Sequence, residues 1–146
     1  MEPIHGLQLE TTSLSNLQVV ADLEYYDGPL LSLYKAPNED HYLYYWCDVD
    51  TQYNRWLAFR VTDAVLNAYV NRKISLRHLI HKLRDGIANV VDLDDEWNYE
   101  HVYVTRPKDL PETYYPKSDT YHESNAELDE NISKNVLHTD QHDVAV

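Results

Sequence analysis

The sequence predicts an α+β domain: an antiparallel sheet of four to six strands, two short helices and a disordered acidic C-terminal tail. Three observations support this class. Alternating apolar and polar residues recur between turn signals along the first sixty residues. The hydrophobic period then changes to a helical one after Thr62, and the composition turns polar after Pro116. We therefore expect a single folded domain at residues 1–116 and a disordered tail at residues 117–146.

The first half of the domain reads as consecutive strands with short connections. Asp27-Gly28-Pro29 is a strong turn signal between two of them. The expected strands are a short one at Leu7–Leu9, then Val19–Tyr26, Leu30–Tyr34, His41–Val49 and Arg55–Val61. Since successive strand residues point to opposite faces, one set of alternate residues should face the core. That set is Leu43, Tyr45, Cys47 and Val49 in one strand and Leu57, Phe59 and Val61 in the next. The four longer strands should form an antiparallel meander.

Two helices follow in the sequence. Thr62 and Ser75 are good N-caps, and Gly86 is placed to end the second helix. Apolar residues at helical spacing mark the buried sides: Val65, Leu66, Tyr69 and Val70 in the first helix and Leu76, Leu79, Ile80 and Leu83 in the second. Two more strands, Ala88–Leu93 and Tyr99–Thr105, complete the pattern.

The segment from Lys117 to Val146 has seven acids, two lysines and no sustained apolar period. Such a composition buries too little apolar surface to offset the entropy of ordering, which predicts disorder. Leu128, Ile132 and Val136 are nevertheless spaced as one side of a helix that could form on a partner.

Composition limits the classes of function. The net charge of −13 argues against general affinity for nucleic acid or anionic membranes and permits binding to basic proteins or mimicry of nucleic acid. The sequence predicts no membrane span and no secretory signal. A single cysteine, Cys47, cannot form an internal disulfide, which favours a cytoplasmic location.

Two groups of residues are candidates for partner binding. Thirteen tyrosines against one phenylalanine fit either a sheet with one wet face or an interface. Outward aromatic residues of two strands could form a patch: Trp46, Trp56, Tyr42 and Tyr44. A basic group surrounds the second helix: Arg72, Lys73, Arg77, His78, His81, Lys82 and Arg84. Its alternative explanation is the ordinary solvated side of an amphipathic helix.

Catalytic and metal sites are weakly indicated. Asp48 and Asp50 do not match a phosphate-transfer motif, because Gln52 stands where threonine is needed. The acidic run from Asp92 lacks the glycine of a calcium loop, since Trp97 occupies that position. The histidine pairs, 78/81 and 138/142, lack a recognisable third zinc ligand. No metal and no cofactor are expected, and an enzyme ranks third among the classes of function that the sequence suggests.

Several short strings together resemble a known family. They are Asp27-Gly28-Pro29-Leu30-Leu31, Tyr42-Leu43 with Trp46, Arg55-Trp56-Leu57, Ile74-Ser75-Leu76-Arg77, Leu110-Pro111 and Tyr115-Pro116. This pattern resembles a family of small bacterial proteins, largely cyanobacterial, classed as a domain of unknown function. The resemblance implies the boundaries of the folded part and a bacterial origin, and it implies no activity or site residues.

The residues favour a non-catalytic protein-binding module, such as an antitoxin, immunity protein or accessory subunit of a bacterial toxin or defence system. The alternative is a regulatory protein that binds or mimics nucleic acid, and a small enzyme ranks below both. A protein partner is expected ahead of a nucleic acid, with no membrane.

Overall fold

The computed structural model describes residues 1–14, 16–25, 28–123, 130 and 132. It contains one antiparallel sheet of seven strands, in the order β1-β7-β6-β5-β4-β3-β2. The predicted count of four to six strands is wrong, because every segment with strand character joins this one sheet. The strands are β1 (Leu7–Leu9), β2 (Gln18–Tyr25), β3 (Pro29–Lys35), β4 (His41–Val49), β5 (Asn54–Val61), β6 (Ala88–Leu93) and β7 (Tyr99–Thr105). The helices are α1 (Asp63–Val70) and α2 (Leu76–His81), and the 3₁₀ turns are η1 (Thr11–Leu14), η2 (Pro107–Asp109) and η3 (Glu112–Tyr114).

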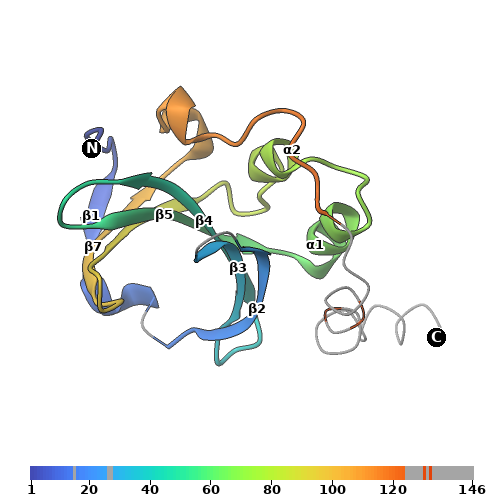
Figure 1. The fold of residues 1–146 in the computed structure, drawn as a ribbon, viewed down its shortest axis with the longest axis horizontal. Coiled ribbons are helices and arrows are strands. Elements are labelled where there is room, and N and C mark those ends of the chain that lie inside the picture. The colour runs from blue at the N-terminus through green and yellow to red at the C-terminus, as the bar shows by residue number, and fades with distance from the viewer. Residues whose placement is uncertain (15, 26–27, 124–129, 131, 133–146) are drawn as a thin grey trace.

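The chain winds through the sheet as two antiparallel meanders. Strands β2 to β5 follow one another, as predicted, and β6 then returns beside β5 after the chain has formed both helices. Strand β7 pairs with β6, and the N-terminal β1 pairs with the free side of β7. Figure 1 shows a strongly curved sheet, with α1 and α2 on the same side of it.

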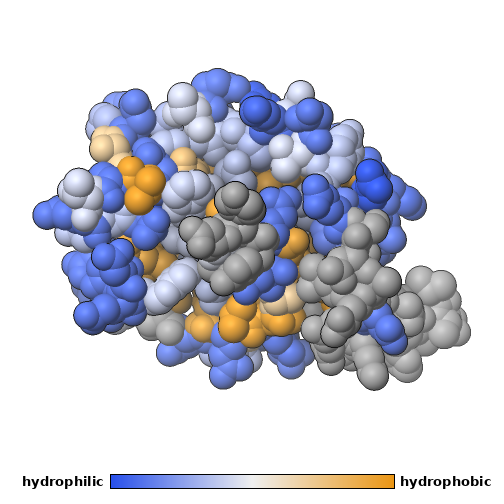
Figure 2. All heavy atoms as spheres, in the orientation of Figure 1, coloured by the Kyte–Doolittle hydropathy of each residue, from blue (hydrophilic) through white to orange (hydrophobic). Residues whose placement is uncertain are grey.

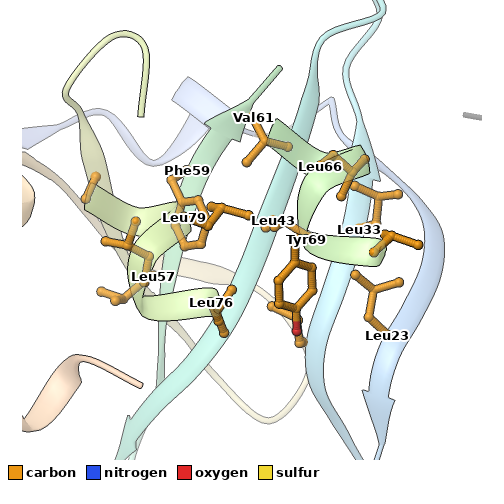
Figure 3. Packing of buried hydrophobic residues seen from close by; sticks show 14 of the residues in the cluster. Leu23, Leu33, Leu43, Leu57, Phe59, Val61, Leu66, Tyr69, Leu76 and Leu79 are labelled. Carbon is orange, nitrogen blue, oxygen red and sulfur yellow. The ribbon is translucent and has the colours of Figure 1, made fainter. Parts of the chain in front are cut away.

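The main hydrophobic core lies between the sheet and the two helices. Leu66 and Tyr69 of α1 lie over β3 and β4, and Leu79 of α2 lies beside Phe59 of β5 (Figure 3). All four side chains are fully buried. The predicted core faces of both helices and of β5 are thereby confirmed. In β4 the prediction fails at Val49, which is 49% exposed, because the register shifts between Trp46 and Asp48.

The opposite face of the sheet is buried as well. Tyr44, Trp56 and Val91 belong to a second cluster, onto which Leu14 and Leu17 of the N-terminal segment pack. The exposed fractions of Tyr44 and Trp56 are 1% and 4%. The expectation of a sheet with one wet face is therefore wrong for the central strands: the N-terminal segment and the curvature of the sheet cover them.

Local signals set the ends of the helices. Thr62 Oγ1 accepts from Val65 N, and Ser75 Oγ accepts from His78 N, which confirms both predicted N-caps. Helix α2 ends at His81 and not near Gly86, so its final turn is missing. Gly86 still serves the turn that follows, since its φ of 66° is a conformation that glycine adopts without strain.

The described chain continues against the domain beyond the predicted boundary at Pro116. Thr120 O accepts from Leu76 N, and His122 is buried against the ring of Tyr69 at a centroid distance of 5.7 Å. Ile132 is also fully buried in the main core. The other residues of the predicted helix, Leu128 and Val136, lie outside the described residues, as does most of the predicted disordered tail.

Among the described residues, no helix combines the length and apolar character needed to cross a membrane.

Candidate functional site

The predicted basic group lies at both ends of α2. Arg72 and Lys73 precede this helix, Lys82 and Arg84 follow it, and all four are exposed. Because α2 has six residues, its two ends are only about 9 Å apart. We call these four residues the basic surface. Hydrophilic residues cover most of the visible face around the two helices (Figure 2).

Among the described residues, the basic surface differs from most other lysines and arginines because its four side chains form no ion pair. Within the described chain, five cations form ion pairs with carboxylates at 4 Å or less: Lys35, Arg55, Arg60, Arg77 and Arg106. None of the four residues of the basic surface has such a partner among the described residues. Lys108 and Lys117 share this condition, but they lie in other segments of the chain.

Arg72 also has an unusual backbone conformation. It follows the C-cap Asn71 of α1, and its φ is +62°. The N–H of Arg72 donates to Tyr69 O, and the N–H of Lys73 donates to Ala68 O. These two bonds define a Schellman motif, in which glycine usually takes the left-handed position. An arginine there costs roughly 1 kcal/mol.

The remaining members of the predicted basic group have other roles. Arg77 pairs with Glu112 at 2.6 Å and lies over the ring of Tyr115 at 5.0 Å. His81 stacks on the same ring with a centroid distance of 5.1 Å. Arg77 and His81 thus fasten the segment after β7 to α2. His78 is exposed on the helix between the two halves of the basic surface.

The predicted aromatic patch is not an exposed surface. Tyr44 and Trp56 are interior residues, and Tyr42 and Trp46 are half-buried beside them in the second cluster. The hydroxyl groups of Tyr44 and Tyr99 lie 2.8 Å apart, and burial raises the pKa of Tyr44 far above its ordinary value. The aromatic group and the helices lie on opposite faces of the sheet. The structure therefore does not join the two predicted recognition groups into one surface.

A buried polar cluster joins six segments of the chain, the N-terminal one among them. Arg55 of β5 donates to both carboxylate oxygens of Asp92, at 2.7 and 2.9 Å. Its Nη1 also donates to Glu2 O at 2.6 Å and to the hydroxyl of Tyr114 at 3.0 Å. That hydroxyl in turn donates to Asp48 at 2.7 Å. We call Arg55, Asp92, Tyr114, Asp48 and the adjacent His101 the Arg55 cluster.

The electrostatics of this cluster follow from burial and pairing. Burial opposes the charge of Arg55, but hydrogen bonds to Asp92 and Tyr114 outweigh it, so the pKa of Arg55 is raised. Burial, and then donation to Asp48, raises the pKa of Tyr114 to about 12. His101 Nδ1 lies 3.1 Å from Asp92 Oδ2. Every charged group in the cluster has a partner, which suits a cross-link between segments.

Cys47 lies next to the Arg55 cluster. Its thiol donates to Arg55 O at 3.5 Å, and burial raises its pKa well above the ordinary value. A thiol that resists ionisation is a poor nucleophile, which agrees with its predicted place in the core.

The two acidic motifs, around Asp50 and Asp94, stabilise the turns in which they lie. Asp50 Oδ1 accepts from the backbone N–H groups of Gln52 and Tyr53, which lowers the pKa of Asp50. Asp94 accepts in the same way from Glu96 and Asn98, and its pKa is also lowered. These bonds hold the β4–β5 and β6–β7 turns. Among the described residues, no group of three or more His, Cys, Asp or Glu side chains could hold a metal ion.

Sequence reasoning missed two groupings. The Arg55 cluster combines residues separated by up to 66 positions, and only the pairing of strands brings them together. The other grouping is a cleft of about 490 Å³ beside His41, Asp63 and Arg84. The sequence did hold a signal for the Arg55 cluster. Arg55 alternates with Leu57 and Phe59 on the core-facing side of its strand, and a charged side chain is rarely buried without a partner.

Comparison with known protein families, with curated proteins and with solved structures finds no match to this chain.

Proposed function

We propose that this protein is a non-catalytic protein-binding module and that the basic surface binds an acidic segment of its partner. The observation that carries the proposal is Arg72. It is exposed, has no carboxylate partner among the described residues and occupies a left-handed position where glycine would be more stable. A cation kept at a cost in stability fits a role in binding.

The surroundings of Arg72 support an electrostatic contact. Lys73, Lys82 and Arg84 add three further exposed cations at the two ends of α2. Elsewhere the protein is strongly acidic, with a net charge of −13. Unpaired cations of this kind contribute little to folding, because even paired surface charges contribute only about 0–1 kcal/mol. They are therefore available to a partner.

An acidic protein segment fits better than nucleic acid. The net negative charge repels an extended phosphate backbone, whereas a short acidic peptide can contact four cations locally. A module of this kind would suit an antitoxin, an immunity protein or an accessory subunit of a bacterial toxin or defence system. That role is part of the proposal.

The proposal is tested by reversing charge at the basic surface. The variant Lys82→Glu is compared with Lys108→Glu, which makes the same charge change at an exposed cation that also lacks a carboxylate partner among the described residues. Each protein is used as bait in a pull-down from the native host, at low and at high salt, with and without nuclease. We expect the first variant to lose a partner that the wild type and the second variant retain.

Other results contradict the proposal in distinct ways. Equal retention by both variants places recognition elsewhere on the protein. Loss of the partner after nuclease treatment, with a log–log salt slope of about 0.7 to 0.9 per contact, indicates binding to phosphates.

A further inference from the structure

The β6–β7 turn presents a tryptophan to solvent in an unusual backbone conformation. Trp97 is 51% exposed, and its ring lies beside that of Trp56 at a centroid distance of 5.8 Å. Its φ is +65°, a conformation that bulky residues rarely adopt and that glycine or asparagine takes at less cost. Exposed tryptophans are among the residues that most often dominate the energy of protein–protein contacts.

Hydrogen bonds fix the turn that holds this ring. Trp97 N donates to Asp94 O at 3.0 Å, and Asp94 Oδ1 accepts from the backbone N–H groups of Glu96 and Asn98, both at 2.9 Å. A partner therefore meets an indole that is already in place, and less conformational entropy is lost on binding.

A second exposed apolar side chain lies on the same face of the sheet. Val49 pairs with Asn54, and Asn54 pairs with Leu93 at the end of β6. Because direct cross-strand partners point to one face, Val49 shares the face of Leu93 and Trp56. Val49 is 49% exposed and lies two strand spacings, about 10 Å, from Leu93. That distance is spanned by about three residues of an extended peptide. We call Val49 and Trp97 the turn surface.

The surroundings of the turn surface are acidic. Asp94, Asp95 and Glu96 directly precede Trp97, and Asp50 lies in the neighbouring β4–β5 turn. None of these four carboxylates has a lysine, arginine or histidine partner within 4 Å in the part of the chain that the structure describes. Hydrogen bonds from backbone N–H groups lower the pKa of Asp50 and of Asp94, so both are ionised at neutral pH. An approaching partner therefore meets a negative potential around an apolar anchor.

We propose that the turn surface binds an arginine-containing segment of a partner protein, with the guanidinium over the indole of Trp97 and the carboxylates of Asp95 and Glu96 around it. Charge complementarity decides the occupant, because a guanidinium stacks on an aromatic ring and donates to carboxylates at the same time. An apolar side chain three residues further along the segment contacts Val49. The same acids repel a nucleic acid, and the net charge of −13 repels a second copy of the chain. This surface goes beyond the proposed function, since it takes a basic segment and the basic surface takes an acidic one.

The experiment follows the indole N–H signals of the three tryptophans by NMR on the full chain. The probe is the peptide acetyl-Arg-Gly-Gly-Leu-amide, and its matched control carries citrulline, the uncharged isostere, in place of arginine. We expect the arginine peptide to shift the signal of Trp97 and to saturate with a Kd of about 1 mM or below. The citrulline peptide should bind about tenfold more weakly, because it lacks the charge that the ring and the carboxylates attract.

Variants then locate the site, with binding followed by the signals of the peptide itself. Trp97→Asn removes the ring but suits the left-handed position, so the fold is retained, and it should weaken binding about tenfold or more. Asp95→Asn should weaken it about threefold at low salt and less at high salt. Tyr121→Asn and Asp119→Asn are the matched controls at exposed residues of another segment, and each should leave the Kd within about twofold.

Several results would overturn the inference. One is the absence of a saturable shift with the arginine peptide, and another is undiminished binding in Trp97→Asn. Equal affinity for the citrulline peptide would assign the surface to an apolar ligand. A Trp97 signal that moves with protein concentration in the absence of peptide would assign it to a second copy of the chain. The probes need no partner from the host, so failure here is distinguishable from failure of the pull-down that tests the basic surface.

Discussion

The Arg55 cluster and the basic surface are two groups of charges with opposite surroundings. Arg55 is 5% exposed, and its guanidinium makes five hydrogen-bond or ring contacts with Asp92, Tyr114 and the backbone of Glu2. Arg72 is exposed and has no carboxylate partner among the described residues. The difference separates charges that fix the fold from charges that are free to bind. Substitutions should therefore affect stability in the first group and recognition in the second.

The largest effect is expected from Asp92→Asn. This change leaves Arg55 buried without a counter-charge, and breaking a buried pair in this way costs about 3–5 kcal/mol. Asp109→Asn is the control, because it removes the partner of Arg106 from an exposed pair and should cost at most about 1 kcal/mol. Urea unfolding measures both.

A double variant sharpens the same test. Arg55→Met combined with Asp92→Leu removes both charges and should recover much of the stability lost in Asp92→Asn, because apolar residues can replace a buried ion pair. A loss below about 1 kcal/mol in Asp92→Asn itself would show that the Arg55 cluster does not hold the fold.

A somewhat smaller loss is expected from the buried side of α2. Leu79 is fully buried beside Phe59, so Leu79→Ala should lower the free energy of unfolding by about 2–5 kcal/mol. His78→Ala, on the exposed side of the same helix, should change it by no more than about 0.5 kcal/mol. Similar values for the two variants would mean that the faces of α2 are wrongly assigned.

Most of the fold was predictable because local patterns specify it. The strands and both N-caps, Thr62 and Ser75, follow from alternation, periodicity and capping residues that lie close together in the sequence. The number of strands in the sheet was underestimated, since the pairing of β1 with β7 joins residues 93 to 97 positions apart. Such pairing leaves no local signal.

The sites were less predictable than the fold. The aromatic side chains of β4 and β5 read as one exposed face because alternation alone cannot show that the N-terminal segment covers them. Tyr44 and Trp56 are consequently core residues. The basic residues near α2 were identified correctly as exposed, with the exception of the half-buried Arg77. Their ion-pairing state depends on distant carboxylates such as Glu112 and could not be read from the sequence.

Alkaline pH should weaken the Arg55 cluster. The pKa of Tyr114 is raised from about 10 to about 12 by burial and by donation to Asp48, so the protonated phenol stabilises the fold. That contribution is complete below about pH 10 and is lost as the pH rises through about 12. Two pKa units correspond to at most about 2.7 kcal/mol.

The unfolding free energy should accordingly fall between about pH 10 and pH 12, and Tyr114→Phe should show a shallower fall than the wild type. Tyr121→Phe is the matched control, because this side chain is 42% exposed. Parallel pH profiles for Tyr114→Phe and the wild type would contradict the assignment of the effect to Tyr114.

The smallest predicted effect on stability is a gain, and it comes from Arg72→Gly. Glycine adopts the left-handed conformation at this position of the Schellman motif without a steric penalty, so the variant should be more stable by roughly 1 kcal/mol. Thermal unfolding measures the change, and Asn71→Gly, at the preceding C-cap with a φ of −86°, is the control that should not stabilise. The same variant removes one cation from the basic surface and should bind the partner more weakly than the wild type. A more stable protein with weaker binding is the combination expected if Arg72 serves recognition, whereas a stabilised variant with undiminished binding would show that this arginine has no part in it.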